Sequence, residues 1–383
     1  MSKPSDRKPD GRRWIPPGVQ LFWGDEARAR HRVMEKIRSI FTQWGYGEII
    51  LPVFDYLETF TSAGGADLGQ KAYTFLDRDG SLMALRPDLT TQIAKVVAAR
   101  FSNEALPLRL MYAGEVFRYE QPRAGQQREF VQLGLEHIGD RFFGADLEVL
   151  LICAESLKAL GVRDFTITLG HAEFFHGICE RLELSDEEAR KLRDSVDHKD
   201  AFALEEGLRH LNIPEAKKKF LISLPQLVGG TDVLRRSRKI VSNRRSLRAL
   251  EELGLVYETL ESLGLGRHCI VDLGEVRKLD YYTGILFKVY AQGLGFEIAG
   301  GGRYDDLLGR FGRSLPAVGF SISLDRLMLL LKTVAPNRRT RRGQTAEILC
   351  GEGRRAVQAA FTRARELRRK GKSVRLRFPA KKK

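Results

Sequence analysis

Polar residues recur with strand periodicity in the segment 114–139, on both sides of a turn that contains glycine. We predict two strands here, Phe117–Glu120 and Glu129–Glu136, joined by a loop centred on Ala124 and Gly125. Amide, carboxylate and guanidinium side chains on one hairpin could form the floor of a small-ligand site. The alternative is a solvated hairpin whose polar side chains face water.

The second predicted strand places its functional groups on one face. Because side chains alternate along a strand, Gln132, Gly134 and Glu136 point the same way. The amide and the carboxylate then lie about 13 Å apart along the strand, on either side of a gap left by the glycine. Arg118 adds a planar, permanently charged group that suits a carboxylate or a phosphate.

The hairpin sequence, FRYE followed by REFVQLGLE, resembles motif 2 of the class II aminoacyl-tRNA synthetases. Within that group it is most similar to histidyl-tRNA synthetase and its non-synthetase relatives. A predicted helix over 24–44, followed by the strand Glu48–Leu51 and Pro52, resembles motif 1, which builds the dimer interface of that family. The resemblance implies an α+β fold with an antiparallel sheet flanked by helices.

A second candidate segment is RPDLT, which begins at Arg86 and places Asp88 and Thr90 after a proline that fixes the backbone. Asp88 or Thr90 could instead cap the helix that follows, and both roles can coexist. In histidyl-tRNA synthetases the loop that it resembles reads RPEGT and holds the amino group of the amino acid. Asp88 and Leu89 depart from that pattern and resemble the regulatory subunits of ATP phosphoribosyltransferase. By resemblance, Asp88, Leu89 and Thr90 are ligand contacts.

A third segment, VRKLDYYTG, resembles the histidine-specific motif of this superfamily, whose tyrosines help to enclose the imidazole. On a strand, Tyr281 and Tyr282 would point oppositely, so that one is core and the other faces the ligand. Arg277 falls where the synthetases keep an arginine that stabilises charge during adenylate formation. Lys278 and Lys288 depart from the glycine and glutamate of a synthetase, which argues against that chemistry.

The glycine-rich segment AGGGRYD resembles the GGRYD motif of the same family. Its three glycines let a backbone approach a ligand closely, although such a run can also be a tight turn. Arg326 resembles the motif 3 arginine that binds the ATP γ-phosphate in synthetases. Arg326 could equally form a surface salt bridge, so we assign it only a vestigial nucleotide contact.

These groups together suit histidine. Glu136 and a tyrosine hydroxyl could hold the imidazole nitrogens, whereas Asp88, Thr90 and Gln132 could hold the ammonium group. Arg118 and Arg277 would face the carboxylate.

We expect three parts along the chain: a basic flexible leader over 1–13, a class II synthetase-like domain over 14–335, and a basic linker with a short βαβ segment over 336–383. A helical insertion over about 185–263 interrupts the large domain. The βαβ segment is shorter than the roughly 50 residues of a free-standing domain, so it should dock on the body or on a partner. A synthetase would carry a longer anticodon-binding domain in its place.

The net charge of +15 lies almost entirely in the segment 338–383, which holds 17 Lys and Arg and 3 Asp and Glu. Solvation or electrostatic steering of a partner explains this segment better than specific RNA recognition, because few aromatic residues are available for base stacking. The four cysteines are far apart, which argues against a zinc site and a disulfide framework and favours a reducing cytoplasm. No apolar run is long enough for a membrane span.

The resemblance implies a regulatory subunit of ATP phosphoribosyltransferase without a cofactor or catalytic residues of its own. Such a protein binds histidine and conveys its concentration to a short catalytic subunit, as a homodimer within a hetero-octamer. The alternative is histidyl-tRNA synthetase, which needs ATP and tRNA. Gln126 and Gln127 stand where a synthetase tends to place arginine and an aromatic residue or histidine, so tRNA charging is not expected.

Overall fold

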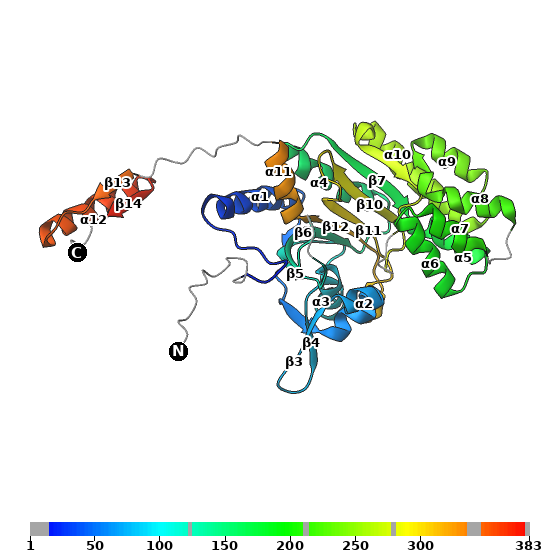
Figure 1. Ribbon diagram of the computed structural model, residues 1–383, viewed down its shortest axis with the longest axis horizontal. Coiled ribbons are helices and arrows are strands. Elements are labelled where there is room, and N and C mark those ends of the chain that lie inside the picture. The colour runs from blue at the N-terminus through cyan, green and yellow to red at the C-terminus, as the bar shows by residue number, and fades with distance from the viewer. Residues whose placement is uncertain (1–14, 122–124, 210–213, 277–280, 335–345, 380–383) are drawn as a thin grey trace, which may run out of the picture. The chain divides into compact units, whose positions relative to one another are not determined.

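A computed structural model of the chain describes residues 15–121, 125–209, 214–276, 281–334 and 346–379. The chain divides into two compact units, Met1–Val334 and Ala335–Lys383 (Figure 1).

The larger unit is built on a nine-stranded sheet. In chain order its strands are β1 (Gly47–Glu48), β5 (Leu108–Phe117), β6 (Glu129–Ile138), β7 (Phe165–His171), β8 (Val228–Gly229), β9 (Cys269–Asp272), β10 (Ile285–Ala291), β11 (Ala299–Arg303) and β12 (Ala317–Ser323). In space their order is β1-β5-β6-β12-β11-β10-β7-β9-β8. Only the β1–β5 and β7–β9 ladders are parallel among the described strands of this sheet, which confirms the predicted α+β fold with a largely antiparallel sheet.

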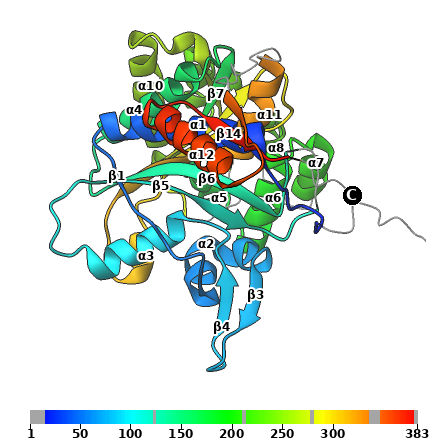
Figure 2. The same cartoon turned by 90° about the vertical axis from the view of Figure 1, so that its left-hand side faces the viewer.

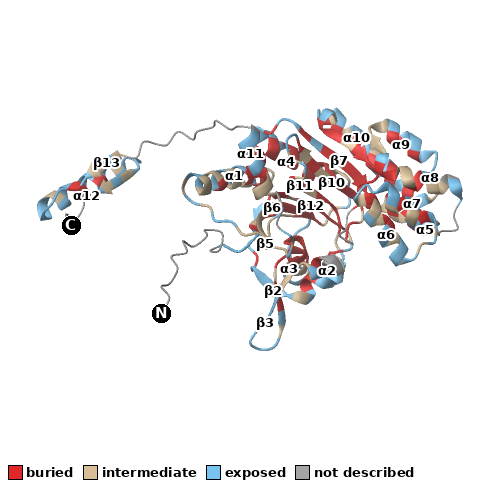
Figure 3. Cartoon of the chain, in the orientation of Figure 1, coloured by how far each residue is buried: buried red, intermediate tan, exposed pale blue. Residues whose placement is uncertain are grey.

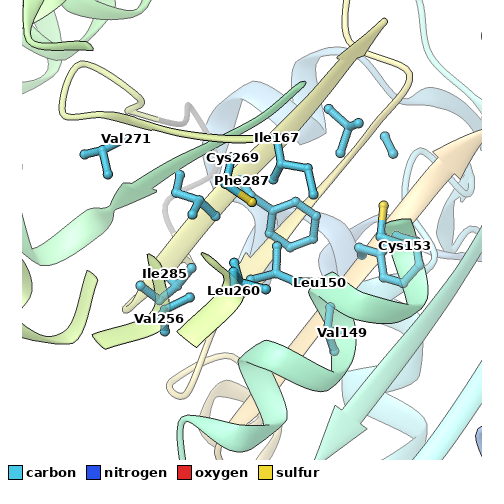
Figure 4. Packing of buried hydrophobic residues seen from close by; sticks show 14 of the residues in the cluster. Val149, Leu150, Cys153, Ile167, Val256, Leu260, Cys269, Val271, Ile285 and Phe287 are labelled. Atoms are coloured by element: carbon cyan, nitrogen blue, oxygen red, sulfur yellow. The ribbon is translucent and has the colours of Figure 1, made fainter. Parts of the chain in front are cut away.

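The two faces of the sheet have different neighbours. Helices α1 (Gly24–Gln43), α4 (Gly144–Ala159), α10 (Arg244–Ser262) and α11 (Leu324–Val334) cover one face. Leu133 and Leu135 of β6 belong to the core on this side, and Leu150 and Phe287 belong to the same core (Figure 4). Because side chains alternate along β6, Gln132, Gly134 and Glu136 face the opposite side, as predicted.

A smaller sheet and two helices lie on that opposite side. The sheet consists of β2 (Phe54–Tyr56), β4 (Leu82–Leu85) and β3 (Tyr73–Leu76), and the helices are α2 (Leu57–Gln70) and α3 (Thr90–Arg100). Figure 2 shows these elements across β5 and β6 from α1 and α4. The turn between β3 and β4 contains Gly80, which has a φ of 86°. Figure 3 shows the tip of this hairpin as exposed, whereas Met83 and Ala84 of β4 are buried and most other buried residues lie on and around the large sheet.

The predicted helical insertion is present. After α5 (Ala172–Arg181) it contains α6 (Asp186–Asp197), α7 (Ala201–Arg209), α8 (Glu215–Ser223), α9 (Thr231–Arg238) and α10. Helix α9 packs on α10. Ser185 begins α6 with a capping box, in which its hydroxyl and the Glu188 side chain each bond the other residue's backbone N–H. The insertion also contributes β8, an edge strand that the sequence pattern did not predict.

The smaller unit is the predicted βαβ segment. It consists of β13 (Ala346–Leu349), α12 (Arg354–Arg369) and β14 (Val374–Arg377), and its two strands pair in parallel.

Two predicted strand boundaries were wrong. The motif 1 strand, predicted over Glu48–Leu51, is paired with β5 at Gly47 and Glu48, and one further bond runs from the Ile49 N–H to the Met111 carbonyl. The first strand of the ligand hairpin, predicted over Phe117–Glu120, ends at Phe117 and begins nine residues earlier. The N–H of Arg118 still donates to the Arg128 carbonyl across the hairpin, but that of Tyr119 donates to the Lys71 carbonyl near the end of α2, so the chain leaves the sheet there.

Candidate functional site

Most of the predicted ligand residues surround one cavity of about 380 Å³ on the face of the sheet away from α1 and α4. The cavity walls include eight of these residues, namely Asp88, Thr90, Arg118, Gln132, Glu136, Tyr281, Tyr282 and Arg326. Arg277 lies outside the described residues, as does its neighbour Lys278.

Leu89, predicted as a ligand contact by resemblance, is not among the residues that line the cavity. The side chain is 2% exposed and packs in the apolar cluster that also contains Ile93 and Val97 of α3. Leu89 immediately precedes α3, and the turn of the chain there directs its side chain toward the core while Asp88 and Thr90 face the cavity.

Glycines make room for the cavity and for the groups around it. Gly319 of β12 pairs with Glu136, and a Cβ at this position would overlap the Glu136 carboxyl. A Cβ at Gly134 would overlap the hydroxyl of Tyr112, its partner on β5. The gap predicted beside Gly134 is therefore filled by a tyrosine and is not open to a ligand.

Glu136 is the chemical centre of the site. Its carboxyl is fully buried and accepts hydrogen bonds from Thr90 Oγ1 at 2.8 Å, from Tyr112 Oη at 3.3 Å and from the Tyr304 hydroxyl. No lysine, arginine or histidine in the described part of the chain forms an ion pair with it. Burial therefore raises the pKa of the Glu136 carboxyl to about 8, so the group can exchange a proton near neutral pH.

Two further acceptors in the cavity wall have no hydrogen-bond partner among the residues that the structure describes. Asp88 Oδ1 accepts from the backbone N–H of Thr90 at 3.2 Å, but Asp88 Oδ2 is buried and unsatisfied. Gln132 Oε1 is also buried and unsatisfied. Burial raises the pKa of the Asp88 carboxyl, and the positive charge of Arg118 opposes this shift. An ammonium group, which carries only donors, would satisfy both oxygens.

Two arginines of the cavity wall are held by the protein itself. Arg118 donates from Nε to the Pro87 carbonyl at 2.8 Å, and its guanidinium lies 5.4 Å from the centre of the Phe130 ring. Arg326 donates from Nε to the Gly125 carbonyl at 2.8 Å and pairs through Nη1 with Glu297 Oε1 at 2.7 Å. Of the two roles considered for Arg326, the structure shows the salt bridge.

Arg86 positions the start of the RPDLT segment. Its buried guanidinium donates to the backbone carbonyls of Leu51 at 2.9 Å, Pro52 at 3.2 Å and Glu115 at 2.6 Å. These bonds fix the motif 1 segment and β5 around the residue that lies two positions before Asp88. The acid of the cavity is thus supported by a rigid network.

The tyrosines of the site differ from the prediction. Tyr281 and Tyr282 lie in a turn with ring centres 4.7 Å apart, both are buried, and both line the cavity, so they do not point to opposite faces. Tyr304 and Tyr112, which bond Glu136, were not predicted. The sequence signal for Tyr304 was its place in GGRYD. Tyr112 could have been found only from its pairing opposite Gly134.

Residues 18–327 match the histidyl-tRNA synthetase family model. The chain is 40% identical over 319 residues to the ATP phosphoribosyltransferase regulatory subunit of Thermoanaerobacter pseudethanolicus, and the match covers 83% of each protein. It is 37% identical over 364 residues to that of Moorella thermoacetica, covering 94% of this chain and 91% of the relative. The chain belongs to the family of ATP phosphoribosyltransferase regulatory subunits. This bears out the resemblance seen in its motifs.

Solved structures agree with this assignment. A Bacillus halodurans protein, described as an ATP phosphoribosyltransferase regulatory subunit/histidyl-tRNA synthetase, has a TM-score of 0.84 and 30% identity, over 99% of this chain and 95% of that one. The histidyl-tRNA synthetase of a Nostoc species has a TM-score of 0.77 at 22% identity and shows the fold alone, over 96% of this chain and 86% of that one.

Other kinds of site are not found in the described ranges. They contain no group of three or more His, Cys, Asp or Glu side chains that could hold a metal ion. All four cysteines are free and buried. No described helix has the length and apolar character needed to cross a bilayer.

The raised pKa of Glu136 predicts a pH-dependent stability. Its pKa is about 8 in the folded chain and 4.5 ordinarily, so protonation of Glu136 favours the folded state. This contribution to stability is complete below pH 4.5 and is lost as the pH rises to 8. Glu136→Gln removes this titration. We expect the difference in free energy of unfolding, variant minus unsubstituted chain, to increase by about 1.4 kcal/mol per pH unit between pH 5 and 8.

Urea unfolding at pH 5, 6, 7 and 8 measures this difference. Glu258→Gln, which changes an exposed carboxylate of α10, is the matched control and should follow the unsubstituted chain. A constant difference between Glu136→Gln and the unsubstituted chain across this range would contradict the assignment.

Proposed function

We propose that this chain binds histidine in the cavity around Glu136 and conveys its concentration to the short catalytic subunit of ATP phosphoribosyltransferase, in the cytoplasm. The observation that carries this proposal is the buried Glu136 carboxyl, which accepts hydrogen bonds from tyrosine hydroxyls and forms no ion pair with any described residue. The chain also belongs to a family of regulatory subunits. A protonatable ring such as imidazole would supply the charged partner that this carboxyl lacks.

The imidazole ring of histidine suits Glu136 because the two groups titrate in the same range. The ordinary pKa of histidine is about 6.5, and that of Glu136 is about 8. Between these values the pair holds one proton, which one group can donate to the other. The second ring nitrogen would bond a hydroxyl of Tyr281 or Tyr282, whose rings also enclose the imidazole.

The remaining groups of histidine match the rest of the wall. Its ammonium group supplies donors for Asp88 and Gln132, whose free oxygens are buried, with Thr90 alongside. Its carboxylate can contact the cationic groups of the cavity wall, which include Arg118 and Lys288. Arg277, which the family resemblance also assigns to the carboxylate, lies outside the described residues.

A regulatory role requires only that occupancy of this cavity changes the partner. The catalytic step, condensation of ATP with phosphoribosyl pyrophosphate, would take place on the other subunit. A coupling free energy of about 1 to 3 kcal/mol between the two subunits would give feedback inhibition by histidine.

We also propose that the chain forms a homodimer within a hetero-oligomer, such as a hetero-octamer. The small sheet exposes apolar side chains, with Phe54 and Phe75 in edge-to-face contact at 5.8 Å and 50% and 40% exposed. Ile50, just before this sheet, is 90% exposed. Monomeric proteins rarely leave such a patch in water.

Removal of the buried carboxyl should weaken histidine binding. Glu136→Ala is expected to cost about 1 to 3 kcal/mol in binding free energy, because a buried hydrogen-bond partner is lost. Isothermal titration calorimetry with L-histidine measures the change. Glu129→Ala, on the same strand but outside the cavity wall, is the control and should bind as the unsubstituted chain does. Equal affinities for the two variants would place the ligand elsewhere.

The partner assay tests the proposal directly. Purified chain mixed with the short catalytic subunit should form a complex whose phosphoribosyl transfer is inhibited by histidine, and Glu136→Ala should raise the histidine concentration needed. Absence of a complex would refute the regulatory role. Robust histidine-dependent pyrophosphate exchange and tRNA charging by the chain alone would show a histidyl-tRNA synthetase instead.

Acidic substitutions on the exposed face of the small sheet test the proposed dimer. The double variant Phe54→Asp and Phe75→Asp should be a monomer by multi-angle light scattering, because two carboxylates would be buried at the interface. Leu263→Asp, at an apolar residue that is 53% exposed near the end of α10, should leave the dimer intact. A dimer in both variants would rule out this surface.

A further inference from the structure

Two ion pairs connect the end of α6 and the turn that follows it to the large sheet, and they have opposite charge order. Lys288 of β10 contacts Asp197, the last residue of α6, at 3.4 Å. Two residues further along, Lys199 donates to Asp272 of β9 at 3.1 Å. The insertion thus supplies the acid of one pair and the base of the other, and the sheet supplies their partners, Lys288 and Asp272.

Only one of these pairs belongs to the cavity. Asp197 and Lys288 line its wall, whereas Lys199 and Asp272 do not. The Asp197–Lys288 pair is therefore within reach of a bound ligand, and the second pair provides a reference for the same junction.

A row of small residues connects Lys288 to β6, the strand that carries Glu136. The strand register places Gly134, Ser321, Gly300 and Lys288 in one row across β6, β12, β11 and β10, with all four on the same face. Three strand spacings span about 14 Å. The two residues of this row between β6 and Lys288 are small, a serine and a glycine.

The contacts of Lys288 are unequal. The buried carboxyl of Glu275 lies at 2.8 Å, and the more exposed Asp197 lies at 3.4 Å. Asp197 stands at the C-terminal end of a helix, where the helix dipole disfavours a negative charge. Asp197 therefore depends on Lys288, whereas Lys288 retains Glu275 if another anion displaces Asp197.

We propose that the Asp197–Lys288 pair is a latch that the carboxylate of a bound amino acid opens, which loosens the α6–α7 hairpin from the sheet. The inference rests on the proposed function, since the carboxylate is that of histidine. The ligand anion contacts Lys288 and displaces Asp197, whose charge then favours solvent over the cavity wall. Occupancy of the cavity is thereby transmitted to the helical insertion.

The test uses Asp197→Asn, which removes the competing charge and preserves the shape of the side chain. Loss of the competitor should raise the affinity for L-histidine in calorimetry by about 3- to 10-fold. In the unsubstituted chain, histidine should increase amide hydrogen exchange over residues 186–209. In Asp197→Asn, exchange in this segment should be high already and should not respond to histidine.

Lys199→Gln is the matched control, because it removes the ion pair that lies outside the cavity. It should increase exchange in the hairpin without a change in histidine affinity. Unchanged or weakened binding by Asp197→Asn, with a folded variant by circular dichroism, would overturn the latch while the unsubstituted chain still binds histidine. If the unsubstituted chain binds no histidine, the proposed function itself fails.

Discussion

The site depends on the burial of one carboxyl group. Glu136 has no exposed surface and, among the described residues, only hydroxyl groups for partners, from Thr90, Tyr112 and Tyr304. Its position requires a glycine opposite on β12, because any side chain there would occupy the space of the carboxyl. An isolated carboxylate is costly to bury, so the protein holds this one with a raised pKa. A ligand that shares a proton with it relieves that cost.

The architecture separates this chemistry from the packing that supports it. Leucines of β6 face the helical side of the sheet, and the polar residues that alternate with them face the cavity. Two arginines hold the surrounding loops: the buried Arg86 fixes the approach to Asp88, and the partly buried Arg326 bonds the loop between β5 and β6. The cavity wall contains both acidic groups, Asp88 and Glu136, and cationic groups, Arg118 and Lys288, which suits an amino acid with charges of both signs. The same wall reaches the helical insertion through Asp197.

The sequence predicted the parts of the site that depend on local periodicity. The alternation of Gln132, Gly134 and Glu136 requires only a strand, and the fold class follows from motifs that keep the family order. Tyr112 and Tyr304 depend on strand register and on a loop after β11, which local patterns do not specify. The burial of the Leu89 side chain depends on the turn of the chain into α3, which the resemblance of the RPDLT segment to the family did not specify. Tyr281 and Tyr282 were misplaced because a turn replaces the strand on which opposite orientations were based.

The central claim is that the buried carboxyl receives the imidazole of histidine. The direct measurement is nitrogen NMR of L-histidine labelled with ¹⁵N in the ring, added to the protein at pH 7. The account predicts a bound signal whose ring nitrogen shifts differ from those of free histidine, as a proton shared with Glu136 requires, and whose shifts change in Glu136→Gln. Bound histidine with ring shifts equal to those in water, or identical in the variant, would contradict it.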